Sequence, residues 1–304
     1  MSRNATFSIS LVLVLSVFFA LCACSGGAPS VSPATNAAGV ISVVAAENFY
    51  GDIAKQLGGS QVAVTSILSD PNIDPHEYES SVQNALAVTH AQLVIQNGDG
   101  YDTWMDKLLA ASPNPQRTVL VATAIVSNKL PDNPHYWYGL DNIQSMAKAI
   151  TDALVRLDGA DKAGFEANLA TFLQSLAPIQ QKMDSIKAKY TGTPVGLTET
   201  IFLYQSTPMG LQVLTPFDFE KAIAEGNDPP ADTVVTANDQ LTNHKIKLLI
   251  YNEQTVTPIT TNLQNMARQL NVPIVPVTET MPVGKTYQQW MLDQLNSLLQ
   301  ALGG

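Results

Sequence analysis

Cysteine is nearly absent from this 304-residue sequence, which contains only Cys22 and Cys24. Both lie in a segment that has the features of a bacterial secretion signal, so the part expected to fold has no cysteine at all. That part therefore forms no disulfide and offers no thiolate to a metal. Any metal site in it must be built from nitrogen and oxygen donors.

Basic residues are also scarce, with 16 Lys and Arg against 26 Asp and Glu, for a net charge of −10. This balance argues against a nucleic-acid partner and against binding an anionic membrane through a basic patch. It suits a cation as the ligand, although acidic surfaces mostly serve solubility.

Several catalytic motifs are missing from the sequence. It contains no HExxH, no GxSxG and no thiol nucleophile in the folded part. The segment Gly284-Lys285-Thr286 resembles the end of a phosphate-binding loop, but Glu279 stands where the first glycine of that motif is required. A metal-dependent hydrolase stays open as an alternative, because a metal held by histidine and carboxylate can activate water.

The N-terminus predicts a lipoprotein. Arg3 precedes an apolar run over 7–20, and Leu21-Cys22-Ala23-Cys24 follows with the pattern of a lipobox. The run is shorter than the ~20 residues that a spanning helix needs. We expect a signal peptide over 1–23, a lipidated Cys24 and a flexible tether over 24–39, with a free product cut near residue 23 as the alternative. The protein is then extracytoplasmic, periplasmic or at the cell surface, and held to the membrane by its lipid.

From residue 40 onward, short apolar β-branched runs alternate with helical patterns, which is typical of α/β folds with parallel sheets. We expect an N-terminal α/β lobe over 40–158, a linking helix over 159–191 and a C-terminal α/β lobe over 192–304, both lobes doubly wound. The expected strands are 40–46, 62–68, 92–96, 119–122, 194–198, 211–214, 246–252 and 272–277.

The longest helical pattern runs from about Asp161 to Tyr190, with an apolar residue every three or four positions. One helix of ~30 residues would be ~45 Å long and could join two lobes. Pro178 lies inside the pattern and predicts a kink, with two shorter helices as the alternative.

Histidine is rare, and two of the four histidines follow a proline directly. His76 lies in Asp74-Pro75-His76-Glu77-Tyr78 and His135 in Asn133-Pro134-His135-Tyr136-Trp137. Each segment follows a predicted strand, where open α/β sheets present their ligands. The other two histidines lack this context and are expected at the surface.

Two glutamates occupy matching places in the second half, since Glu199 and Glu279 each come just after a predicted strand. Two imidazoles with two carboxylates suffice to bind a divalent transition metal. Carboxylate oxygens move the preference toward manganese, while zinc accepts the same donors. Asp74 and Tyr204 are further candidates for orienting the ligands, with turn and packing roles as the alternatives.

These segments together resemble one known family, the extracytoplasmic solute-binding proteins of zinc and manganese ABC transporters. The resemblance spans nearly the whole chain after the tether. It is carried by Gly58-Gly59, residues 74–79, Asn97-Gly98 before Trp104, residues 133–137, Thr198-Glu199 ahead of Phe202 and Tyr204, and Thr278-Glu279 before Tyr287.

The resemblance implies a fold of two α/β lobes bridged by one long helix, with the metal in the cleft between the lobes. It implies four metal ligands, His76, His135, Glu199 and Glu279, and a membrane permease as the partner of a monomeric protein. The position of Glu199 is His in most zinc binders of the family and Glu in several manganese binders, and Glu279 stands where Asp is usual. We therefore expect Mn²⁺ as the transported ligand, with Zn²⁺ second. The competing classes are a hydrolase with a glutamate base and an adhesin-like surface lipoprotein.

Overall fold

The structure is a computed structural model that describes residues 39–70, 73, 78 and 80–303. All of these belong to one compact unit, Asn36–Gly304. The predicted signal peptide, Cys24 and nearly all of the tether lie outside the described residues, as do Asp74 and His76. Among the helices that are described, none is both long and apolar enough to cross a membrane.

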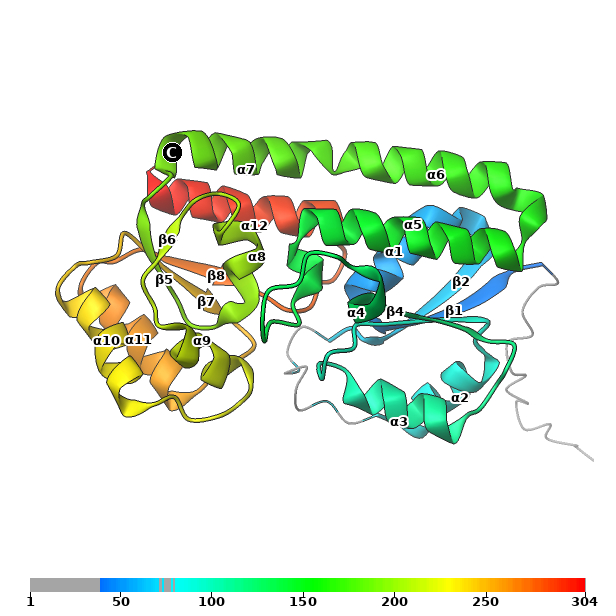
Figure 1. Ribbon diagram of the computed structural model, residues 1–304, viewed down its shortest axis with the longest axis horizontal. Coiled ribbons are helices and arrows are strands. Elements are labelled where there is room, and N and C mark those ends of the chain that lie inside the picture. Colours follow the sequence, from blue (N-terminus) through cyan, green and yellow to red (C-terminus); the bar gives the residue numbers. More distant parts are fainter. Residues whose placement is uncertain (1–38, 71–72, 74–77, 79, 304) are drawn as a thin grey trace, which may run out of the picture. The chain divides into compact units, whose positions relative to one another are not determined.

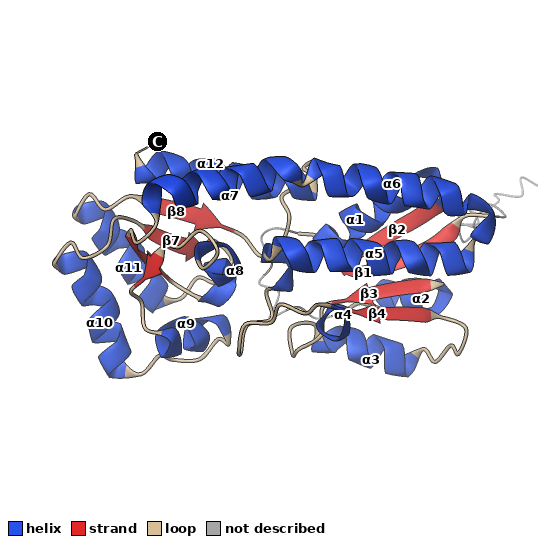
Figure 2. Cartoon of the chain, turned by 45° about the horizontal axis from the view of Figure 1, so that its top comes forward, coloured by secondary structure: helices blue, strands red, loops and turns tan. Residues whose placement is uncertain are grey.

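The first half of the chain forms a four-stranded parallel sheet in the order β2-β1-β3-β4 (Figures 1 and 2). In β1, Val43 and Ala45 pack into one hydrophobic cluster with α1 and α5, while Val44 and Ala46 pack into another with α2 and α3. Both faces of this strand are thus buried, which explains its unbroken apolar sequence. The elements are β1 (Ile41–Glu47), α1 (Asn48–Gly58), β2 (Val62–Leu68), α2 (Val82–His90), β3 (Leu93–Gln96), α3 (Thr103–Ala111), β4 (Thr118–Val121), α4 (Ala122–Ile125) and α5 (Leu140–Leu157).

The second half repeats this plan with a parallel sheet in the order β6-β5-β7-β8. Two of its helices begin with capping boxes, at Thr257 for α11 and at Thr286 for α12. The elements are β5 (Pro194–Leu197), α8 (Leu203–Ser206), β6 (Gln212–Val213), α9 (Phe217–Ala224), α10 (Ala231–Thr242), β7 (Leu249–Asn252), α11 (Pro258–Gln269), β8 (Ile274–Val277) and α12 (Tyr287–Leu302). The predicted α/β class with two parallel sheets is confirmed.

The long helical segment is divided into α6 (Lys162–Ser175) and α7 (Ala177–Tyr190), so its two-helix alternative describes the structure better than a single kinked helix. Pro178 has no N–H to donate to the carbonyl of Gln174, which interrupts the hydrogen-bond ladder at this turn. Leu176 keeps helical dihedral angles, with φ −80° and ψ −16°, and α6 and α7 run on from each other in Figure 1. α6 packs against α1 and α5, whereas α7 packs against α12.

Direct contacts join the two halves near the carboxyl ends of their strands. The Asn48 side chain donates to the Met281 carbonyl at 2.7 Å and accepts from the Met281 N–H at 2.9 Å. The hydroxyl of Tyr287 donates to the carbonyl of Trp137 at 2.7 Å. The largest hydrophobic cluster contains residues of both sheets, so the halves share one core in addition to a smaller cluster in each half.

Candidate metal centre

Three polar side chains meet at the carboxyl edge of the second sheet. Glu199 lies two residues beyond β5, Asn252 is the last residue of β7, and Glu279 lies two residues beyond β8. The order β5-β7-β8 makes these strands neighbours, and parallel strands end at the same edge. The two glutamates therefore lie close together on either side of Asn252.

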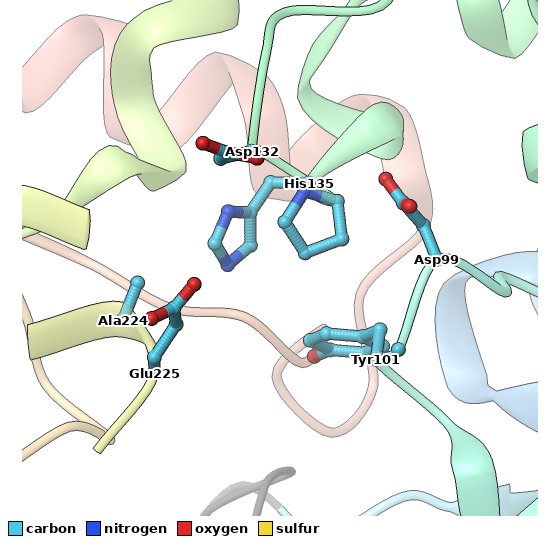
Figure 3. A pocket seen from close by; sticks show the side chains of 8 residues that line it. Asp99, Tyr101, Asp132, His135, Ala224 and Glu225 are labelled. Atoms are coloured by element: carbon cyan, nitrogen blue, oxygen red, sulfur yellow. The ribbon is translucent and has the colours of Figure 1, made fainter. Parts of the chain in front are cut away.

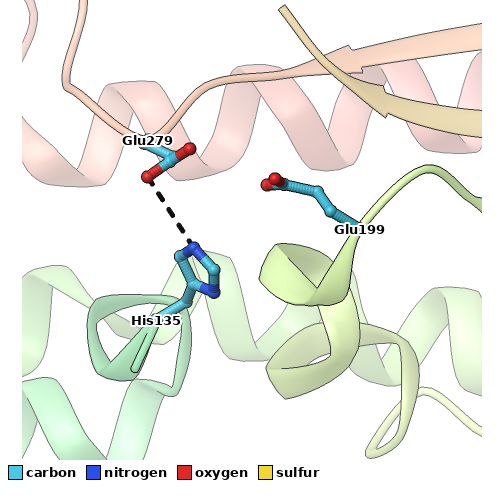
Figure 4. A group of neighbouring side chains, drawn as sticks. All are labelled: His135, Glu199 and Glu279. Atoms are coloured by element: carbon cyan, nitrogen blue, oxygen red, sulfur yellow. Dashed lines mark ion pairs between the residues drawn. The ribbon is translucent and has the colours of Figure 1, made fainter. Parts of the chain in front are cut away.

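His135 comes from the first half, from the loop between α4 and α5 that leads into the 3₁₀ turn Tyr136–Tyr138. It meets Glu199 and Glu279, each residue offering one ligand atom within 4.8 Å of the others (Figure 4). All three are buried, with exposed fractions of 0%, 1% and 0%. The structure thus brings together three of the four predicted ligands, and the fourth, His76, lies outside the described residues.

The hydrogen bonds of the His135 ring fix its tautomer. The Asn133 amide donates through Nδ2 to the Thr200 carbonyl at 2.8 Å, so its Oδ1 faces the imidazole, 2.8 Å from His135 Nδ1. Because Oδ1 can only accept, Nδ1 carries the hydrogen, and Nε2 is the ring nitrogen turned toward the glutamates. A neutral imidazole oriented in this way is suited to bind a metal.

His135 Nε2 lies 3.7 Å from Oε2 of Glu279. That separation is too long for a hydrogen bond. Two donors bound to one ion at ~2.1 Å each are separated by ~3–4 Å, so this spacing suits a shared cation.

The two carboxylates are held by neutral donors. Asn252 Nδ2 lies 2.9 Å from Glu199 Oε1 and 2.6 Å from Glu279 Oε1. The hydroxyl of Tyr101 donates to Glu279 Oε2 at 2.9 Å, and burial together with the charge of Glu279 raises the pKa of Tyr101 well above its usual value. These hydrogen bonds orient the two carboxylates beside His135, and oriented carboxylate oxygens next to an imidazole are a donor set that suits a divalent cation.

Four contributors to this region were not predicted as site residues, namely Tyr101, Asn133, Glu220 and Asn252. Glu220 is buried on α9, and its pKa is raised well above the usual value by burial and by the charge of Glu199. In the sequence, Asn133 was noted only as part of the Pro-His segment. No sequence motif pointed to the other three residues, Tyr101, Glu220 and Asn252. The hydroxyl of Tyr204, which was predicted as a possible orienting residue, donates to the Asn133 carbonyl at 3.1 Å and accepts from the Leu130 N–H at 2.9 Å, in the loop before His135.

A cavity of about 330 Å³ opens beside His135 (Figure 3). Its lining includes the carboxylates of Asp99, Asp132 and Glu225 together with Tyr101. Carboxylates around an opening raise the local concentration of cations.

A pair of buried carboxyl groups lies behind the loop that carries Tyr101. Asp102 accepts the N–H groups of Asn97 and Gly98 at 2.7 Å each, which favours its ionised form. Glu47, at the end of β1, is fully buried, and its pKa is raised well above the usual value by burial, by the charge of Asp102 and by a hydrogen bond to that carboxylate. We infer that Glu47 is the member of the pair that keeps a proton.

This pair predicts a pH dependence of stability that Glu47→Gln should reduce. Because the pKa of Glu47 is raised on folding, its stabilising contribution is complete below the unfolded pKa of about 4.3 and is lost as the pH rises through the folded pKa. One such group changes the free energy of unfolding by at most about 1.4 kcal/mol for each pH unit. Glutamine mimics the protonated acid, so the variant should lose less stability between about pH 5 and pH 8. Urea unfolding across that range, with the exposed Glu166→Gln as control, tests this; an unchanged slope for Glu47→Gln would contradict it.

The fold has two parallel β-sheets flanked by helices, and a buried cluster of one histidine and two carboxylates lies at the strand ends. Together they define a metal-binding protein of the two-lobed solute-binding class. The family model described as zinc-uptake complex component A, periplasmic, matches residues 43–301. The chain belongs to this family, which is a family of transporter solute-binding proteins, and the family predicted from the sequence is confirmed.

Relatives of known name agree with this assignment. The chain is 25% identical over 312 residues to the metal ABC transporter substrate-binding lipoprotein FimA of Streptococcus parasanguinis, covering 94% of this chain and 96% of the relative. It is 25% identical to the manganese ABC transporter substrate-binding lipoprotein PsaA of Streptococcus anginosus, covering 96% and 97% of the two chains. It is 29% identical over 194 residues to the iron ABC transporter substrate-binding lipoprotein MtsA of Streptococcus pyogenes, covering 59% and 60%.

Solved structures share the fold. The periplasmic zinc binding protein TroA of Treponema pallidum superposes with a TM-score of 0.71 at 17% identity, covering 87% of this chain and 99% of that chain. The protein FpvC of Pseudomonas aeruginosa in complex with Mn²⁺ superposes with a TM-score of 0.70 at 18% identity, covering 87% and 98%.

Proposed function

We propose that this protein is the extracytoplasmic component of an ABC transporter that captures a divalent transition metal and delivers it to a membrane permease. The observation that carries the proposal is the buried group of His135, Glu199 and Glu279. One imidazole and two carboxylates, each with a ligand atom within reach of the others, form a donor set that suits a divalent transition metal.

The proposed ligand set is His76, His135, Glu199 and Glu279. His76 enters on its sequence alone, because it shares the Pro-His context of His135 and follows β2 as the glutamates follow their strands. Asp74 is proposed to accept a hydrogen bond from the His76 ring.

We propose Mn²⁺ as the metal, with Zn²⁺ second. Two carboxylate oxygens beside imidazole move a site toward manganese and iron, whereas zinc accepts the same donors and binds more tightly in general. Relatives whose names specify manganese, iron or zinc support a transition metal in this site. Glu279 is one methylene longer than the usual aspartate, which places its carboxylate farther from the backbone.

We propose that the protein has no catalytic activity, since four protein ligands leave no open position for a substrate. It acts as a monomer, tethered through a lipidated Cys24. The proposed divisions are a signal peptide over 1–23, a tether over 24–39, lobes over 40–158 and 192–304, and a linking segment over 159–191. No observation favours the hydrolase or the adhesin-like protein.

Metal analysis of protein purified without added metal tests this function. We expect the wild type to retain about one Mn²⁺ or Zn²⁺ per chain, and His76→Ala to retain almost none because a ligand is lost. The exposed His90→Ala is the matched control and should behave as the wild type. Stoichiometric metal in His76→Ala would remove that residue from the site, and a wild type that binds neither ion would overturn the proposal.

Deletion of the gene in its own host separates the three classes of protein. Metal accumulation should fall in the deletion strain and recover with the wild-type gene. Unchanged accumulation would favour the adhesin-like protein, and turnover that a chelator abolishes would favour the hydrolase.

A further inference from the structure

Asn252 occupies the one strand end that lies between the two glutamates. β7 pairs with β5 on one side and with β8 on the other, and Asn252 stands opposite Val277 in the register. Its side chain is buried with an exposed fraction of 1%. Any group at this position therefore faces both carboxylates.

The orientation of the Asn252 amide is fixed by its surroundings. Its Oδ1 accepts the N–H of Gln254 at 3.0 Å, and its backbone N–H donates to Thr198 Oγ1 at 3.2 Å. The NH₂ group must then face the carboxylates, and its two hydrogens match the two charged acceptors. Hydrogen bonds to charged acceptors are about twice as strong as neutral ones, so the contact from Nδ2 to Thr255 Oγ1 at 2.8 Å is secondary.

Asn252 Nδ2 donates to one oxygen of each glutamate, Oε1 of Glu199 and Oε1 of Glu279. In Glu279, Oε1 accepts from both Asn252 and Thr255, whereas Oε2 accepts from Tyr101 at 2.9 Å and is the atom that faces His135 Nε2. A carboxylate whose first oxygen is held by an N–H is biased toward giving a metal its second oxygen alone. One amide thus occupies one oxygen of each glutamate.

We propose that Asn252 is a specificity-determining residue of the metal site, because it restricts Glu199 and Glu279 to single-oxygen ligation and so limits the number of donors. This inference rests on the proposed function. A small donor number suits zinc, which is most often four-coordinate, whereas manganese prefers more oxygen ligands. Asn252 therefore moderates the manganese preference that two carboxylates would otherwise give.

The test compares the affinities of Asn252→Ala and wild type for Mn²⁺ alone and for Zn²⁺ alone. Without the amide, each carboxylate is able to bind the metal ion through both of its oxygens. The Kd for Zn²⁺ should rise about 10- to 100-fold, as for other residues that orient metal ligands. The factor by which the Kd for Mn²⁺ rises should be about ten times smaller. The ratio of the two dissociation constants then shifts toward manganese.

X-ray absorption of the zinc-loaded proteins gives a readout other than affinity, and the number of oxygen ligands should rise in Asn252→Ala. Thr255→Val, a change of nearly equal size, removes the 3.2 Å bond to Glu279 Oε1 and the 2.8 Å contact from Asn252 Nδ2 but leaves the Asn252 amide in place, so it should give a smaller shift in the same direction. The exposed Asn262→Ala on α11 is the control and should match the wild type.

Equal losses for the two metals, or an unchanged number of oxygen ligands in both Asn252→Ala and Thr255→Val, would overturn the role of Asn252 while leaving metal capture intact. A wild type that binds neither metal would instead overturn the proposed function.

Discussion

His135→Ala is expected to weaken metal binding by at least about 100-fold and to leave the purified protein without stoichiometric metal. The substitution removes the donor that the first half contributes to the described cluster. Glu199 and Glu279 would keep their hydrogen bonds to Asn252 but would lose the imidazole beside them. Titration calorimetry with Mn²⁺ and with Zn²⁺ measures the loss.

The matched control for His135 is His244→Ala, because His244 is exposed and lies after α10, away from the cluster. Circular dichroism checks that both variants keep the fold. A His135→Ala protein that is folded and retains one metal per chain with unchanged affinity would remove His135 from the site.

Trp137→Ala is expected to lower the free energy of unfolding by about 3–5 kcal/mol, the usual cost of emptying a large aromatic position. The Trp137 ring is fully buried, stacks on Phe49 with centroids 4.5 Å apart, and lies 4.8 Å from the Tyr101 ring. For a chain of this size the melting temperature should fall by roughly 6–20 °C. Thermal unfolding by calorimetry provides the measurement.

Val283→Ala serves as the control for Trp137, since Val283 is 81% exposed. Its effect should stay within about 0.5 kcal/mol, as is usual at the surface. A loss of less than about 1 kcal/mol for Trp137→Ala would mean that this aromatic cluster does not support the core shared by the two halves.

Much of the fold was predictable because buried parallel strands and amphipathic helices leave periodic patterns. The first and last residues of the helices and strands were harder to predict. β7 was expected from Ile246, but it begins at Leu249, which is its first residue paired with β5, opposite Gly196. The short helices α4 and α8 were missed because four residues are too few to show a helical period.

The candidate site was predictable to the extent that its ligands follow strands. His135, Glu199 and Glu279 were found by that rule, and the structure brings them together. Asn252 was not found, because its role depends on β7 lying between β5 and β8, an order in space that the chain order does not specify. Tyr101 was missed for the same reason, since its bond to Glu279 joins residues 178 positions apart.

Anomalous diffraction from crystals grown with Zn²⁺ tests the central claim most directly. A single strong peak is predicted within about 2.5 Å of His135 Nε2 and of one carboxylate oxygen from each of Glu199 and Glu279. A peak confined to the carboxylates of the neighbouring cavity, Asp99, Asp132 and Glu225, or no peak at all, would contradict it.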